Sequence, residues 1–254
     1  MLGSLLDDGA GDGALLVVAH PDDETMFFSP TILSLASELR LHVLCLSTGD
    51  YDGLGALRAT ELPRACAQLG VHAARVDVVD DDNLRDGPST IWPSAVVSAH
   101  VRKALELHGL RRVITFDAGG VSGHANHVGV CHGVRLLAAE EAARSSSSSS
   151  AATLVVYELL STGWLRRHLS FWEVAITIAA MALGQLTACQ GRPRRVCFVS
   201  PRPWACHLAM REHTSQYVWY RRLYVLLSRY VFVNTLVAHR SGSPPRLNTM
   251  PTWN

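Results

Sequence analysis

The chain of 254 residues lacks several features that would assign it to a class at once. Its six cysteines show no C-x-x-C spacing, so we expect a reducing compartment and no disulfide framework. Zinc binding by cysteine stays open, although the spacing typical of such sites is missing. No Walker loop and no G-x-G-x-x-G motif follows the first apolar run, which argues against a nucleotide cofactor. Lys plus Arg number 23 and Asp plus Glu 22, so the chain has no overall charge that would attract nucleic acid.

Apolar runs alternate with helical patterns along much of the chain, which is typical of a parallel sheet with helices on both faces. We therefore predict one α/β domain over residues 14–240, with a Rossmann-like, mostly parallel sheet. The expected strands are Ala14–Ala19, Leu41–Ser47, Arg75–Val79, Arg111–Phe116 and Thr153–Tyr157. The expected helices are Thr31–Leu39, Leu57–Leu69, Ser94–His108 and His127–Ala143.

Three segments have the composition of flexible chain. Residues 1–13 are acidic and contain glycine, and they resemble neither a signal peptide nor a membrane span. Residues 145–150 are six consecutive serines, which indicate a flexible linker. Residues 241–254 begin with Ser, Gly and Pro and are expected to form a flexible tail.

Two further segments are unusually apolar. Residues 171–189 lie between arginines, and we expect a core or interfacial helix, with a membrane span as the alternative. Residues 217–233 are aromatic and basic, which is typical of a helix in an anionic membrane surface or of a helix closing on the sheet. Within the second segment, Arg222 and Arg229 are seven positions apart and would share one helix face.

The first cluster of polar residues, Ala19–Thr25, directly follows the first predicted strand. Ligands bind at the carboxyl ends of the strands in open parallel sheets, so His20 and the two adjacent carboxylates should lie at that edge. Adjacent Asp22 and Asp23 can point in different directions, so one can bind a metal while the other faces a water molecule. The simpler alternative is an aspartate that only caps a helix.

The second cluster follows the predicted strand Arg111–Phe116 about a hundred residues later. His124 and His127 are three positions apart, which places both imidazoles on one face of a helical turn. Together the clusters supply two imidazoles and a carboxylate, and a catalytic zinc site adds a water molecule to such a set. The sequence therefore predicts a site for Zn²⁺ or another divalent metal where the carboxyl ends of two strands meet.

These motifs resemble those of the PIG-L family of zinc-dependent de-N-acetylases. Ala19–Glu24 matches the family signature, and His124–His127 matches its second metal motif. Met26–Phe28 and His213–Arg221 are similar to the eukaryotic branch, the N-acetylglucosaminyl-phosphatidylinositol de-N-acetylases. The resemblance covers most of residues 14–236. Members of that branch usually begin with a membrane helix, from which residues 1–13 differ.

The resemblance implies a role for each residue of the two clusters. His20, Asp23 and His127 would bind the zinc ion. Asp22 would act as the general base, and His124, as an imidazolium, would serve as the acid or stabilise the oxyanion.

Three more residues are candidates for binding the substrate. The resemblance makes Arg58 a candidate for the substrate's phosphate or inositol, and the alternative is a surface arginine paired with Glu61. Asp50 lies in the loop before it. Asp117 is a candidate for orienting His124 or contacting sugar hydroxyls, with loop capping as the alternative.

Three functions are compatible with these features. The first is a hydrolase that removes acetate from N-acetylglucosaminyl-phosphatidylinositol (GlcNAc-PI) in GPI-anchor biosynthesis. It would act on a glycolipid at a membrane surface, on the cytoplasmic face of the endoplasmic reticulum. The second is a soluble deacetylase of a small GlcNAc conjugate, and the third is a catalytically silent protein that binds a sugar lipid. The sequence indicates no oligomeric state.

Overall fold

The computed structural model describes residues 10–146, 154–168, 170, 172–182 and 195–240. Most of the segments predicted to be flexible, and part of the apolar segment, lie outside the described residues. These parts are residues 1–9, 147–150, 171, 183–189 and 241–254.

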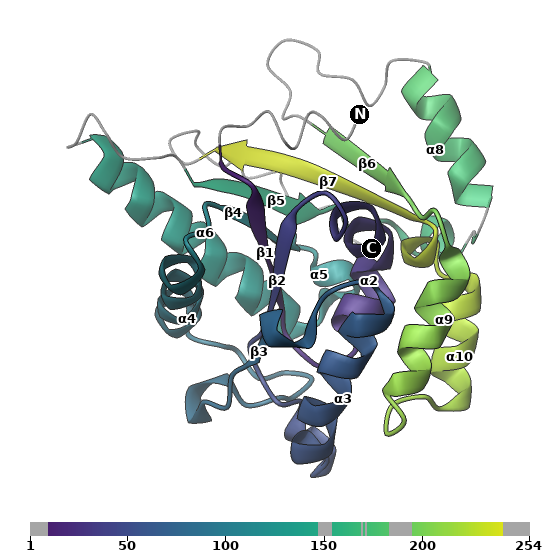
Figure 1. Ribbon diagram of the computed structural model, residues 1–254, viewed down its shortest axis with the longest axis horizontal. Coiled ribbons are helices and arrows are strands. Elements are labelled where there is room, and N and C mark those ends of the chain that lie inside the picture. The colour runs from purple at the N-terminus through teal and green to yellow at the C-terminus, as the bar shows by residue number, and fades with distance from the viewer. Residues whose placement is uncertain (1–9, 147–153, 169, 171, 183–194, 241–254) are drawn as a thin grey trace.

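A seven-stranded mixed sheet forms the centre of the fold, in the order β3-β2-β1-β4-β5-β7-β6 (Figure 1). The first five strands are parallel and correspond to the five predicted ones, whereas β7 is antiparallel to both β5 and β6. All six residues of β1 are buried, because the strand lies between neighbours and both faces are covered. The strands are β1 Gly13–Val18, β2 Arg40–Cys45, β3 Val76–Val78, β4 Arg112–Phe116, β5 Val155–Leu159, β6 Arg195–Val199 and β7 Val233–Arg240.

Helices cover both faces of the sheet, as predicted. Helices α4 and α6 pack on one face, and α2, α3 and α9 lie on the other (Figure 1). The α-helices are α2 Asp23–Leu35, α3 Gly55–Gln68, α4 Ser94–His108, α5 Gly120–Gly123, α6 Ala125–Ser146, α7 Trp164–Arg167, α8 Trp172–Ala182, α9 Pro203–Glu212 and α10 Trp219–Leu227. Short 3₁₀ turns are η1 Asp50–Asp52, η2 Ala73–Arg75, η3 Asp82–Leu84 and η4 Arg229–Val231.

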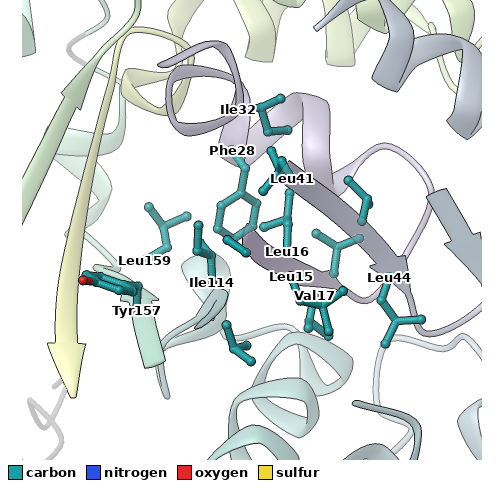
Figure 2. Close-up of a cluster of buried hydrophobic side chains, with 14 of the residues drawn as sticks. Leu15, Leu16, Val17, Phe28, Ile32, Leu41, Leu44, Ile114, Tyr157 and Leu159 are labelled. Carbon is teal, nitrogen blue, oxygen red and sulfur yellow. The ribbon is translucent and has the colours of Figure 1, made fainter. Parts of the chain in front are cut away.

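The core between α2 and the sheet holds the first motif in place. Phe28 and Ile32 of α2 lie over Leu16 of β1 and Ile114 of β4, and all four are fully buried (Figure 2). The ring of Phe28 also meets that of Phe116 edge to face, with centroids 5.1 Å apart. Each such side chain contributes about 1.5–3 kcal/mol on burial, so the start of α2 is fixed relative to β1 and β4.

The C-terminal part of the chain is joined to α2 by buried polar contacts. Asn234 on β7 donates to the carbonyl of Phe27 at 2.9 Å and accepts from the Thr31 hydroxyl at 2.7 Å. His213, just after α9, donates through Nε2 to Glu24 at 2.7 Å, and both side chains are fully buried. Burial disfavours the charged imidazole, yet Glu24 raises the pKa of His213 above its ordinary value.

The segment 217–233 differs from its prediction. Helix α10 ends at Leu227, and Ser228 is extended and caps the following turn. Arg229 is only 1% exposed and lies 3.3 Å from Glu173. The prediction that Arg222 and Arg229 share a helix face is therefore wrong, because seven-residue spacing aligns side chains only in a continuous helix.

Among the described residues, no helix is long and apolar enough to cross a membrane. Helix α8, the described part of the apolar segment, packs against β7. It buries Glu173 and Thr177, while Trp172 and Ile176 are exposed. The described part of this helix therefore turns polar groups inward and apolar groups outward.

An ion pair between a half-buried arginine and a buried glutamate joins α6 to β5. Arg135 donates to both oxygens of Glu158 at 2.7 Å, and His239 lies 3.5 Å from the same carboxylate. Burial would raise the pKa of Glu158, but Arg135 and His239 outweigh it and lower that pKa to about 2.

We expect Arg135→Met to lower the free energy of unfolding by about 3 kcal/mol at neutral pH, because Glu158 is left buried without its main partner. A carboxyl whose pKa is depressed on folding stabilises the fold above its unfolded pKa. The difference from the wild type should therefore shrink as the pH falls below 4.5, the ordinary value for Glu158. Urea unfolding at several pH values measures this, and a difference independent of pH would contradict it.

Candidate functional site

Two loops that follow neighbouring strands bring the predicted metal ligands together. Strands β1 and β4 are adjacent and parallel, so the loops after them meet at one edge of the sheet. His20 and Asp23 come from the first loop and His127 from the second, and one ligating atom of each lies within 4.8 Å of the others. All three side chains are buried.

Hydrogen bonds orient Asp23 and His127 as metal ligands. His127 donates from Nδ1 to the carbonyl of Gly120 at 3.1 Å, which leaves Nε2 3.2 Å from Asp23 Oδ1. Metal-binding imidazoles commonly donate their second N–H to such a carbonyl. The other oxygen of Asp23 accepts from the backbone of Ala19 and His20 at 3.1 and 2.8 Å. Burial opposes ionisation, but His127 and His20 hold the pKa of Asp23 well below its usual value.

His20 lies between two groups of possible ligands. Its Nδ1 is 3.6 Å from Asp23, and its Nε2 is 3.0 Å from both Asp86 and Asn126. His20, Asp86 and His124 form a second group whose ligating atoms lie within 4.8 Å of one another. Burial lowers the pKa of His20, but Asp23 and Asp86 raise it overall to about 10, so a metal must displace a proton here.

The donor set fits a divalent metal. Two imidazoles and a carboxylate, with a free corner for water, are typical of catalytic zinc. The carboxylate and one imidazole are already oriented by backbone groups. The residues present therefore match the predicted metal site.

Asp86 is a member of the site that the sequence motifs did not indicate. It lies in the loop after η3, which follows β3, and its side chain is largely buried against His20 and Arg58. Burial opposes ionisation, yet His20 and Arg58 lower the pKa of Asp86. The signal that could have found it is an acidic loop at the carboxyl end of a predicted strand, the same rule that located the first cluster.

Arg58 is buried, so the alternative of a surface arginine paired with Glu61 is wrong. Its guanidinium donates to the carbonyls of Gly49 and Pro21, each at 2.7 Å. It also lies 3.6 Å from Asp22. Arg58 therefore fixes the loop that carries the first motif.

The backbone is strained at one residue in each of the two loops that carry the site. Asp22 has φ 119° and Val121 has φ 63°, in the left-handed region that side chains with a Cβ rarely adopt. Such residues cost about 1–3 kcal/mol each and cluster at functional sites. The side chains of the adjacent Asp22 and Asp23 have different partners, since Asp22 faces arginines and Asp23 faces His127.

The carboxylate of Asp22 faces two arginines. Arg221 on α10 lies 3.0 Å from Oδ2, and Arg58 lies 3.6 Å from Oδ1. Burial raises the pKa of Asp22, and the two arginines only partly oppose that rise. Arg221 falls in a stretch used for the family resemblance, but its contact with the first motif could not be foreseen from the sequence.

His124 is half-buried, with its ring centroid 4.8 Å from that of His127. The backbone N–H of Asn126 donates to Nδ1 at 3.3 Å, so the proton of the neutral ring lies on Nε2. Burial, then the charges of His127 and His20, lower the pKa of His124 to about 4. This argues against the predicted imidazolium and for a neutral ring at neutral pH.

The remaining two candidates cap loops. Asp117 accepts from the backbone and hydroxyl of Ser161 at 2.7 and 2.5 Å and from Gly119 at 3.0 Å. Asp50 is exposed and accepts from Gly55 at 2.6 Å. Within the described residues, neither belongs to a group of possible metal ligands. The structure therefore does not bring these two carboxylates into the cluster.

Comparison with known proteins adds independent findings. Residues 15–138 match the family model described as PIG-L, GlcNAc-PI de-N-acetylase. The N-acetylglucosaminyl-phosphatidylinositol de-N-acetylase of Bos taurus is 37% identical over 231 residues, which cover 90% of this chain and 84% of the relative. A probable enzyme of the same name from Schizosaccharomyces pombe is 33% identical over 232 residues, covering 89% and 87%.

Solved structures support the same fold. The N,N'-diacetylchitobiose deacetylase from Pyrococcus horikoshii aligns with a TM-score of 0.60 over 90% of this chain and 84% of its own. The sequences are 14% identical over that alignment, so the likeness concerns the fold alone.

Proposed function

The chain belongs to the PIG-L family of GlcNAc-PI de-N-acetylases, and from this premise we propose that it removes acetate from GlcNAc-PI in GPI-anchor biosynthesis. It is an enzyme that hydrolyses N-acetyl groups. The third function considered from the sequence, a catalytically silent protein that binds a sugar lipid, is therefore excluded. One observation carries the proposal: the buried cluster of His20, Asp23 and His127, with Asp22 and His124 directly beside it.

The enzyme is metal-dependent, and we assign the metal as zinc on the chemistry of the donor set. His20, Asp23 and His127 would hold it. When bound, it supplies a Lewis acid that polarises the acetamide carbonyl and lowers the pKa of a water molecule to about 7.

The side chains around the cluster would move the protons. Asp22 would accept the proton of the attacking water, and a carboxylate whose pKa is raised by burial is a better acceptor. Neutral His124 would donate a hydrogen bond from Nε2 to the developing oxyanion, and the proton that Asp22 took from the water would pass to the departing amine. The products are acetate and the free glucosamine amine.

The contacts suggest a revised assignment for the other candidates. Arg58 would position Asp22 and Asp86, because its guanidinium is buried and already bonded to backbone carbonyls. Asp86 replaces Asp117 as the carboxylate for sugar hydroxyls, since it lies beside His20. Asp50 and Asp117 would only stabilise the loops in which they lie.

A membrane surface is the proposed place of action. Helix α10 exposes Trp219 and Leu223, and Ser170, just before α8, donates to the carbonyl of Leu226 at 3.0 Å. This contact links the end of α10 to the segment just before α8. Arg221 of α10 contacts Asp22, so a bilayer against α10 would lie close to the active site. The cytoplasmic face of the endoplasmic reticulum suits the free cysteines found among the described residues.

The two enzyme functions differ in their substrates. We expect the purified chain to release acetate from GlcNAc-PI in vesicles far faster than from the same head group without acyl chains, because the vesicle concentrates both partners on one surface. Acetate measured at equal substrate concentrations decides this. Faster release from the soluble conjugate would favour the soluble deacetylase instead.

A further inference from the structure

A surface cavity of about 480 Å³, widely open to solvent, lies outside the metal cluster, between the end of α9 and the start of α10. Its lining is basic and aromatic: Arg211, Thr214, Tyr217 and Arg222. The catalytic scheme uses none of these four side chains. The cavity is therefore separate from the proposed catalytic machinery.

The two arginines of this cavity lack acidic partners within the described residues. Arg222 lies over the ring of Tyr217, 4.6 Å from its centroid, and donates to the Tyr217 carbonyl at 3.1 Å. Glu212, which follows Arg211 in the chain, is 3.9 Å from Arg64 and accepts from Gln68 at 3.1 Å. Two uncompensated positive charges in one cavity favour an anion, and guanidinium groups bind phosphate particularly well.

The surface beside the cavity is apolar. Trp219, Arg222, Leu223 and Leu226 are spaced as i, i+3, i+4 and i+7, so they form one exposed stripe of α10, and Val225 beside the stripe is buried. Trp219 is 72% exposed, and its ring meets that of the neighbouring Tyr220 edge to face. Tryptophan and arginine beside exposed leucines are typical of a surface that enters the head-group region of a bilayer.

We propose that Arg211 and Arg222 bind the phosphate of an anionic membrane phospholipid while the apolar stripe of α10 enters the bilayer surface. The proposal rests on the proposed function, because only a lipid substrate requires docking at a membrane. Arg221, the residue before Arg222, reaches inward to Asp22 at 3.0 Å. A head group bound in the cavity therefore holds the active-site edge against the membrane that carries the substrate.

The test measures binding to vesicles. Vesicles of phosphatidylcholine containing phosphatidylinositol are compared with vesicles of phosphatidylcholine alone, using the full chain. We expect Arg211→Gln combined with Arg222→Gln to weaken binding to the anionic vesicles by about 30-fold, given the usual contribution of a basic residue at an anionic surface. Arg211→Gln alone, which alters one exposed side chain, should weaken it by about 5-fold.

The matched control combines Arg75→Gln with Arg111→Gln. It removes the same charge, but these arginines directly precede β3 and β4 and so lie at the opposite edge of the parallel strands. Binding of the control should stay close to that of the wild type. If both double variants bind the anionic vesicles equally weakly, binding depends only on the net charge of the protein. That result would contradict a phosphate site at Arg211 and Arg222.

Soluble glycerophosphoinositol distinguishes a bilayer ligand from a free phosphate. We expect this compound to release the protein from the anionic vesicles only weakly. It carries the phosphate but has no acyl chains to contact the apolar stripe of α10. If it binds as tightly as the vesicles do, the cavity serves a soluble ligand and the bilayer proposal is wrong. Acetate release by the wild type from a soluble substrate analogue tests the proposed function separately, since that reaction needs no vesicle.

Discussion

Replacing His20, Asp23 or His127 with alanine is expected to lower metal content sharply and to reduce deacetylation by at least about 10³-fold. The ordinary pKa of water is 15.7, against about 7 on zinc, so loss of the metal removes the nucleophile at neutral pH. Asp23→Ala should be the most severe, because both carboxylate oxygens have assigned roles. Oδ2 is held by two backbone N–H groups, and Oδ1 faces His127.

Metal content by elemental analysis and acetate release are measured on the same samples. Asp50→Ala is the matched control, because it removes an exposed loop carboxylate that caps Gly55 and should leave metal content unchanged. Full metal occupancy in all three cluster variants would contradict the assignment of these residues as metal ligands.

Asp22→Asn is expected to keep the metal and lose about 10²–10⁴-fold in activity, the usual contribution of a general base. Asparagine tolerates the left-handed backbone conformation of position 22 and still offers an oxygen to Arg58 and Arg221, so the local structure should survive. It cannot accept the proton of the attacking water. This variant therefore separates proton transfer from metal binding.

Single-turnover acetate release and metal content decide this prediction together. If Asp22→Asn turns over as fast as the wild type, another group is the base, and Asp22 then serves only to hold the two arginines. Loss of the metal in the same variant would instead place Asp22 among the ligands.

The sequence predicted the parts of the fold whose signals are local. Strands such as β1 and β4 are short apolar runs, and the polar residues at their carboxyl ends indicated the position of the metal cluster. Strands β6 and β7 were not predicted, and β7 inserts between β5 and β6. Its pairing partners lie far away in the chain, and an antiparallel insertion leaves no signature in a simple alternation of strands and helices.

The rest of the site depends on contacts between distant segments. Arg221 reaches Asp22 across 199 positions of chain because α10 folds over the start of α2. Asp86 reaches His20 from a third loop, and Arg229 is buried with Glu173. Spacing rules fix which residues share a face of one element, but they do not say which element the face will meet.

The most direct test of whether this chain is a metal-dependent de-N-acetylase of GlcNAc-PI is to titrate metal-free protein with Zn²⁺ and to measure the acetate that it releases from GlcNAc-PI. We predict no release without metal, and release that rises in proportion to bound Zn²⁺ until each chain holds one ion. Acetate release that is equally fast without metal, or no release at any metal content, would contradict this function.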